Sequence, residues 1–367
     1  MSIRTRENIS REMVSREKES REKHFEEISP GLWARREPPP PGLDKVDAVI
    51  FDIDGVLVDV SESFPHVLPP AVQYYFNNMV GVPGSAGLVT AESSGVFKLA
   101  GRYNNDWDVA NGAVCYGLLK LLSPDGGSAA ATPSMETIAS AGPSLEEFTA
   151  EIKTRGGGLD NTLVLMREKL GEEKFEKFRS LYQPGVVKKI FMEHYAGRNL
   201  CRTFYGCDPE YYSGPGLAER ELYLPDLPLL EDLTGIGVGL GVLSGRTIEE
   251  AEYVLGKMGL DQLLPAGWVV LDDGALPGKP DPAGLRLLER RMGFERAVYV
   301  GDTPDDWTTV ENFRAGLEDT SRIAGCQVET GASNTPRLID RFEEDRVDYL
   351  ATDVNCFLRA LAAVKEK

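Results

Sequence analysis

The stretch "VIFDIDGVLVDV", residues 49–60, decides the fold of this chain because it joins a buried strand to a pair of acids. Its apolar run ends in Asp52 and Asp54, and Gly55 and a second hydrophobic run follow at once. Carboxylates are costly to bring together at the edge of a hydrophobic core. The stretch therefore predicts a strand whose carboxyl end carries two acids for a chemical purpose, and the rest of the chain must supply their partners.

The C-terminal part of the chain, from residue 236 onward, alternates strand-like runs with helical patterns. The strand-like runs are "IGVGLGVLS", "WVVLDD", "RAVYVGD", "RIAGCQVET" and "VDYLATD", and the helical ones are "TIEEAEYVLGKMG", "DPAGLRLLERRMG", "DDWTTVENFRAG" and "NCFLRALAAVK". Such alternation implies right-handed crossovers and a mainly parallel sheet. We predict an α/β, Rossmann-like core formed by residues 45–60 and 220–367, with "VDAVIFD" in the same sheet.

Residues 61–219 have a different character and predict a second domain. Four segments are amphipathic with helical spacing: "AVQYYFNNMV", "DVANGAVCYGLLKLL", "NTLVLMREKLGEEKFEKFRSLY" and "VVKKIFMEHYAG". Residues 123–144 are rich in Ser, Ala, Gly and Pro, which is typical of a flexible insertion. We expect a large, mainly helical domain inserted into the core after its first strand.

The N-terminal segment, residues 1–44, predicts a charged extension and a Pro-rich linker. Residues 1–29 alternate Arg and Lys with Glu and have few large apolar side chains to bury. "EPPPPGLD" breaks any helix, so the folded body is expected to start near Lys45. Two interpretations stay open for the extension: an inert segment, or an arm that docks a partner.

Composition excludes several classes of function. The 58 acidic against 40 basic residues give a formal charge of −18, which argues against a nucleic-acid partner. No apolar run approaches the roughly 20 residues that span a membrane. The five cysteines form no CxxC pair and favour a reducing compartment, with Cys201 and Cys207 as an alternative redox pair. We expect a cytoplasmic protein without a membrane partner.

Polar residues follow the predicted strands at the edge where open parallel sheets bind ligands. Besides the two acids of the first strand they are Ser244 with Gly245, Lys279, Asp302, Asp305 and Asp306. An aspartate can attack a phosphoryl group if Mg²⁺, held by carboxylates, and a lysine offset the negative charge. A second carboxylate can protonate the leaving alcohol and later deprotonate water. The chemistry predicted is phosphoryl transfer, in which one aspartate attacks and the other manages protons.

Four motifs resemble those of haloacid dehalogenase-like phosphohydrolases and occur in the family's order: "DIDGVLVD", "LSGR", "GKPDP" and "GDTPDD". The resemblance covers residues 46–356 and implies a core of the haloacid dehalogenase type. The insertion resembles the helical cap of the subfamily that includes phosphoglycolate phosphatases. The resemblance assigns a role to each motif residue: Asp52 as nucleophile, Asp54 as acid and base, Ser244, Gly245 and Lys279 as phosphate ligands, and Asp52, the Asp54 carbonyl, Asp302 and Asp306 as Mg²⁺ ligands.

Residues beside the motifs have competing interpretations. Arg246 either contacts substrate or pairs with an acid of the cap. Thr247, with Glu250 three residues on, suits the N-cap of the following helix and leaves Ser244 for phosphate. Asp305 suits the first turn of a helix better than a ligand position. In the cap, "GRYNNDWD" offers either substrate-facing residues or only cap structure; the candidates include Arg102, Asn105 and Trp107.

The function predicted is a Mg²⁺-dependent phosphatase that hydrolyses a small phosphorylated metabolite through an aspartyl-phosphate, with the cap closing over the substrate. Three alternatives remain. Haloacid dehalogenases lack the second aspartate, so Asp54 argues against that activity. Phosphomutases carry a histidine where this chain has Phe64. A catalytically silent, partner-binding protein would lack a motif aspartate or the lysine, and this chain has them all.

Overall fold

The computed structural model describes residues 21–84, 87–103, 105–123, 134–330 and 347–366. The chain divides into two compact units. The sheet unit consists of Met1–Val60 and Leu222–Lys367, and the helical unit consists of Ser61–Glu221.

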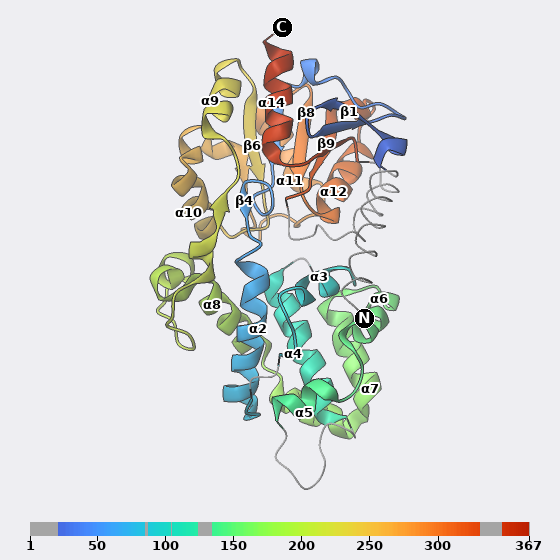
Figure 1. The fold of residues 1–367 in the computed structure, drawn as a ribbon, viewed down its shortest axis with the longest axis vertical. Coiled ribbons are helices and arrows are strands. Elements are labelled where there is room, and N and C mark those ends of the chain that lie inside the picture. The colour runs from blue at the N-terminus through green and yellow to red at the C-terminus, as the bar shows by residue number, and fades with distance from the viewer. Residues whose placement is uncertain (1–20, 85–86, 104, 124–133, 331–346, 367) are drawn as a thin grey trace, which may run out of the picture. The chain divides into compact units, whose positions relative to one another are not determined.

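The sheet unit is built on eight strands in the order β1-β2-β10-β9-β8-β3-β6-β7. Figure 1 labels β1, β9, β8 and β6 of this sheet. Its parallel strands are β10 (Tyr349–Ala351), β9 (Ile323–Val328), β8 (Ala297–Gly301), β3 (Ala48–Phe51), β6 (Gly239–Leu243) and β7 (Val269–Val270). All four residues of β3 are buried, because the strand lies inside the sheet between β6 and β8. The predicted α/β fold with a mainly parallel sheet is confirmed.

An N-terminal hairpin extends this sheet, and the sequence pattern did not predict it. Strands β1 (Phe25–Ser29) and β2 (Leu32–Arg35) pair antiparallel, and β2 also pairs antiparallel with β10. The expectation that residues 1–44 lie outside the folded body is therefore wrong for these two strands. Phe25 and Leu32 are 3% and 0% exposed, and the charged residues around them obscure this short apolar pattern. Residues 1–20 lie outside the described part of the chain.

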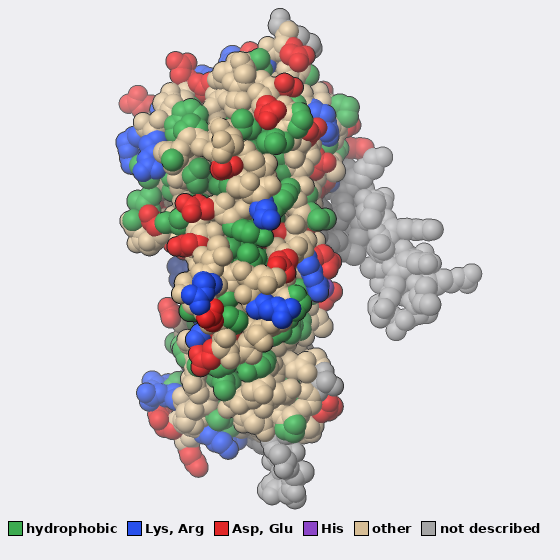
Figure 2. Space-filling model, turned by 90° about the vertical axis from the view of Figure 1, so that its left-hand side faces the viewer, with side chains coloured by type: hydrophobic (Ala, Val, Ile, Leu, Met, Phe, Trp, Pro, Cys, Tyr) green, Lys and Arg blue, Asp and Glu red, His purple; other side chains and the backbone are tan. Residues whose placement is uncertain are grey.

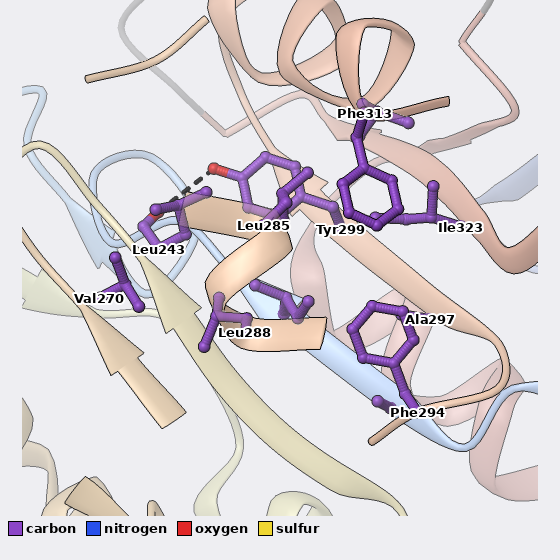
Figure 3. Packing of buried hydrophobic residues seen from close by; sticks show 12 residues of the cluster. Leu243, Val270, Leu285, Leu288, Phe294, Ala297, Tyr299, Phe313 and Ile323 are labelled. Carbon is purple, nitrogen blue, oxygen red and sulfur yellow. Dashed lines mark hydrogen bonds between the residues drawn. The ribbon is translucent and has the colours of Figure 1, made fainter. Parts of the chain in front are cut away.

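In its described residues, the sheet unit contains the four helices predicted to follow its strands and one further helix, ahead of β6, that the sequence pattern did not predict. They are α9 (Leu227–Gly235), α10 (Ile248–Met258), α11 (Ala283–Met292), α12 (Pro304–Arg314) and α14 (Val354–Lys365), with short 3₁₀ turns at Leu43–Lys45, Leu260–Gln262, Ala266–Trp268 and Thr320–Arg322. Helix α14 packs against α9 and lies in front of the strands in Figure 1. Helices α11 and α12 pack on the sheet around a cluster that includes Leu285, Leu288 and Phe313 (Figure 3).

A two-stranded ribbon marks where the chain leaves and re-enters the sheet unit. Strand β4 (Val58–Asp59) pairs antiparallel with β5 (Leu222–Tyr223), and the Leu224 amide donates to the Leu57 carbonyl at 3.0 Å. The two ends of the inserted segment are thereby held together.

The helical unit has eight helical segments in its described residues, besides a 3₁₀ turn at Leu217–Arg220. They are α2 (Phe64–Tyr74), a π-helical turn (Tyr75–Val80), α3 (Ser93–Lys98), α4 (Asp106–Leu122), α5 (Met135–Ser140), α6 (Leu145–Thr154), α7 (Gly158–Leu181) and α8 (Pro184–Tyr205). Helix α4 contacts α2, α7 and α8 and buries almost its whole length. Gly117 of α4 allows a close approach of the Leu88 side chain, which lies 2.4 Å from where a Cβ would be.

Part of the predicted flexible insertion is helical. Ser134 caps α5 by accepting a hydrogen bond from the Thr137 amide, and Met135 and Ile138 are buried. Two apolar side chains at helical spacing are enough to anchor this short helix within a polar sequence. The rest of the insertion, residues 124–133, lies outside the described residues.

In the described residues, no helix combines the length and hydropathy that a membrane span requires. On the face drawn in Figure 2, acidic side chains are mixed with basic ones.

Candidate active site

The carboxyl ends of three neighbouring strands bring the motifs together. Asp52 follows β3, Ser244 follows β6 and Asp302 follows β8, and β3 is paired in parallel with both of the others. Parallel neighbours end at the same edge of a sheet, so residues about 250 positions apart become adjacent. The order of the strands is what assembles this site.

Asp52 is a buried carboxylate, 4% exposed, and both of its oxygens are engaged. Oδ1 accepts a hydrogen bond from the Ile53 amide at 2.7 Å, and Oδ2 lies 2.8 Å from Lys279 Nζ. Burial raises the pKa of Asp52 to about 6, although Lys279 opposes the rise and nearby Asp306 adds to it. The contacts orient the Asp52 side chain. Its raised pKa reflects burial and nearby negative charge, and a bound cation would favour the ionised form.

Lys279 links Asp52 to a second buried group. Its Nζ lies 2.7 Å from Asp306 Oδ1 and 3.3 Å from the Tyr299 hydroxyl oxygen. Burial acts to lower the pKa of Lys279, but the two carboxylates outweigh it and raise the pKa well above the usual value. Lys279 is therefore a fixed positive charge at the strand ends.

Tyr299 is a buried participant that the four motifs do not include and that the sequence-based prediction missed. Its hydroxyl lies 2.9 Å from Asp306 Oδ1 and 3.2 Å from the Leu243 carbonyl oxygen, the contact drawn in Figure 3. The signal was present in the sequence: Tyr299 is the one hydroxyl-bearing residue in the apolar strand "AVYVG". Buried hydroxyls require partners, and here the partners belong to the motifs.

Asp306 accepts more hydrogen bonds than its neighbours. Its Oδ2 accepts from the amides of Asp302 and Thr303 at 3.1 and 2.9 Å and from the Thr303 hydroxyl at 2.8 Å, forming a capping box at the start of α12. Burial acts to raise the pKa of Asp306, but Lys279 and the Thr303 hydrogen bonds hold it below the usual value. Asp306 thus orients both Lys279 and the loop that carries Asp302.

The second acid of motif one pairs with a buried arginine. Arg246 Nε and Nη2 each lie 2.7 Å from Asp54 Oδ1. The Asp54 side chain is 35% exposed and that of Arg246 1% exposed. Arg246 was predicted either to pair with an acid of the cap or to contact substrate. The neighbour that the structure gives it is Asp54, a residue of the sheet unit itself.

The loop after β6 offers backbone and hydroxyl donors. Ser244 is buried, and its hydroxyl oxygen accepts from the Arg246 amide at 3.4 Å. Gly245 is exposed, and a Cβ added there would meet nothing within 4 Å. Thr247 caps α10 by accepting from the Glu250 amide, as predicted, so the cap and Ser244 are separate.

Three buried carboxylates are close enough to hold one cation. Oxygens of Asp52, Asp302 and Asp306 lie within 4.8 Å of one another. Hard oxygen donors of this kind suit Mg²⁺, and clustered negative charge without a cation is unfavourable. The donor set therefore fits a divalent metal, although both oxygens of Asp306 already accept hydrogen bonds.

The residues predicted to face substrate from the cap belong to the helical unit. Arg102 is exposed and has a positive φ of 59°, and Asn105 is the N-cap residue of α4. The Trp107 ring centroid lies 4.1 Å from Lys188 Nζ, a cation–π contact that the sequence pattern does not reveal. Their role in substrate binding stays a prediction.

The chain belongs to the haloacid dehalogenase-like hydrolase family, whose sequence model matches residues 46–312. The resemblance inferred from the four motifs is confirmed.

Solved structures share the fold. A phosphatase from Thermococcus thioreducens is 22% identical with a TM-score of 0.54, and the match covers 86% of this chain and 98% of that one. A structural-genomics target is 16% identical with a TM-score of 0.57 over 88% of this chain and 100% of the other. A curated relative, imidazoleglycerol-phosphate dehydratase from Phytophthora nicotianae, is 26% identical over 263 residues, or 71% of this chain. The match covers 40% of that relative's length.

Proposed function

We propose that the protein is a Mg²⁺-dependent phosphatase that hydrolyses a small phosphomonoester through an aspartyl-phosphate on Asp52. One observation carries the proposal: a buried aspartate at a strand end lies 2.8 Å from a fixed lysine charge and beside two further carboxylates. A nucleophile, a cation for phosphate oxygens and a set of metal ligands are the groups that phosphoryl transfer requires.

Asp52 and Asp302, with the Asp54 carbonyl, would hold the metal. The Mg²⁺ ion would supply positive charge that lets an anionic nucleophile approach an anionic phosphoryl group. In the described part of the chain, Asp306 accepts hydrogen bonds from five donors, three of them at Oδ2, whereas each Asp52 oxygen has one such contact. We therefore assign Asp306 to positioning Lys279 and Asp302 rather than to direct ligation.

The chain's own residues divide the remaining work. Lys279, Ser244 and the exposed Gly245 backbone would bind phosphoryl oxygens and stabilise the transition state. An Asp52 oxygen forms a bond to phosphorus while the ester oxygen departs with a proton from Asp54. Asp54 then removes a proton from water, whose oxygen attacks phosphorus, releases inorganic phosphate and restores Asp52.

The test is phosphate release by the full chain across a panel of sugar, polyol and organic-acid phosphates, with Mg²⁺ and with EDTA. Imidazoleglycerol phosphate joins the panel because the curated relative carries that name. Metal-dependent release that disappears in Asp52→Asn is the expected result. Arg322→Gln is the control, because Arg322 precedes β9 at the opposite end of the strands and pairs with Glu289. Release that persists in Asp52→Asn overturns the mechanism.

Two related activities are distinguished in the same panel. A 2-haloacid assayed for halide tests dehalogenation, and a phosphosugar assayed for its isomer tests mutase activity. Either product without free phosphate would replace the proposed reaction.

A further inference from the structure

We propose that Arg246 is a positioning residue that holds Asp54 Oδ1 so that Oδ2 exchanges the proton with the leaving group. The inference rests on the proposed function, because it gives the general acid a fixed orientation. Nothing in the four motifs assigns Arg246 this role.

The geometry restricts Asp54 at one oxygen. Arg246 Nε and Nη2 both lie 2.7 Å from Oδ1, so two N–H donors converge on that atom. Both donors belong to one edge of the guanidinium, so they approach Oδ1 from the same side and stabilise negative charge on that oxygen. A proton carried by Asp54 therefore resides on Oδ2.

The two partners of this ion pair differ in burial. Arg246 is almost wholly buried, whereas about a third of the Asp54 side chain is exposed. A buried guanidinium is retained only where anions or carbonyls compensate its desolvation, so its position is set by the protein interior. The arginine thus supports the carboxylate from the buried side and leaves its exposed side for chemistry.

The loop that carries Arg246 is itself fixed. The Arg246 amide donates to Ser244 Oγ at 3.4 Å, and its carbonyl accepts from the Asp272 amide at 3.2 Å. Arg246 is also the residue immediately before the α10 N-cap, Thr247. A rigid loop can hold the guanidinium, and through it the Asp54 carboxylate, in one position, whereas a flexible surface side chain could not.

The test compares kcat/KM for phenyl phosphate and 4-nitrophenyl phosphate, which differ mainly in how strongly the leaving oxygen needs a proton. The variants are Arg246→Met, Arg246→Lys, Asp54→Asn, the double variant Arg246→Met with Asp54→Asn, and the control Arg322→Gln. Arg246→Lys keeps the charge but lacks the two-pronged fork, and it preserves the test if Arg246→Met folds poorly.

A misplaced general acid lowers kcat/KM most for the substrate with the more basic leaving group. Arg246→Met is expected to lower kcat/KM about 10–100-fold for phenyl phosphate and about threefold or less for 4-nitrophenyl phosphate. Arg246→Lys falls between wild type and Arg246→Met. In the Asp54→Asn background the arginine change costs nothing further, since it acts through that carboxyl group.

Equal losses on both substrates, or a further loss in the Asp54→Asn background, would overturn the inference while the proposed function stands. They would mean that Arg246 contacts the phosphoryl group or serves the fold alone. Absence of wild-type turnover on both esters and on the whole metabolite panel overturns the proposed function and this inference with it.

Discussion

Replacing Asp52, the proposed nucleophile, should stabilise the metal-free protein. Asp52→Asn removes one charge from a buried cluster in which three carboxylates lie within 4.8 Å of one another. The pKa of Asp52 is about 6 in the folded protein against 3.8 for an ordinary aspartate. At about 1.36 kcal/mol per pKa unit, ionised Asp52 lowers the free energy of unfolding by about 3 kcal/mol at pH 8. The neutral amide of Asp52→Asn avoids that penalty, so the melting temperature should rise by roughly 5–10 °C.

The direction of the pH dependence follows from the folded and unfolded pKa values of Asp52. Because the folded pKa lies above the unfolded one, the native state binds the proton more readily, and the penalty is fully present above pH 6. It declines as the pH falls from about 6 towards 4, where Asp52 is protonated in the folded state. Wild type and Asp52→Asn should therefore differ most at pH 8 and converge near pH 4.

The assay is thermal and urea unfolding in EDTA at pH 4, 6 and 8. Asp232→Asn is the control, since Asp232 is an exposed acid on α9 in the same unit and the change in charge is identical. Mg²⁺ at pH 8 should stabilise wild type more than Asp52→Asn, because only wild type keeps the full set of carboxylates. A variant that is less stable than wild type in EDTA at pH 8, or a difference that does not change with pH, would refute the reasoning.

Lys279→Met should abolish phosphate release and destabilise the fold by about 3–5 kcal/mol, since it leaves two buried carboxylates without their cation; calorimetry measures the loss. Glu193→Gln should destabilise the helical unit by about 1–3 kcal/mol, because its carboxylate accepts from three successive backbone amides; faster hydrogen exchange in that loop is the readout. Gly157→Ala should lower the free energy of unfolding clearly more than Gly171→Ala. Both glycines have positive φ, but only at Gly157 would the new Cβ lie 2.3 Å from the Gly101 carbonyl oxygen; equal melting temperatures would contradict this.

The sequence carried enough information for the parallel sheet and for the residues at its strand ends. Apolar runs such as "AVIF" and "AVYVG" are buried on both faces, and short continuous runs of this kind, alternating with helical patterns, indicate strands of a parallel sheet. The hairpin of β1 and β2 was not predicted because its apolar residues are few and its neighbours are charged. What makes it a strand pair is the edge of β10, a partner about 315 residues away that local pattern does not reveal.

The sequence predicted that Asp52, Lys279 and Asp302 lie together at the strand ends, and the structure places them there. Their roles in the reaction stay predictions, and the contacts among the side chains were less predictable. The pairing of Arg246 with Asp54 depends on which rotamers the neighbouring loops allow. The occupancy of Asp306 by five donors depends on a capping box and on Tyr299, and hydrogen-bond saturation of this kind is a property of three-dimensional packing.

The insertion of 161 residues between β3 and its partners is compatible with one sheet because its ends meet. Residues 58–59 pair with residues 222–223, so the inserted segment begins and ends on the same ribbon. A folded insertion whose ends are adjacent imposes far less closure entropy on the sheet than a flexible loop of that length. The first motif can thus lie far from the others in sequence while its strand pairs directly with both β6 and β8. The sheet unit can therefore keep its carboxylates, lysine and arginine in fixed positions whatever helices the insertion contains.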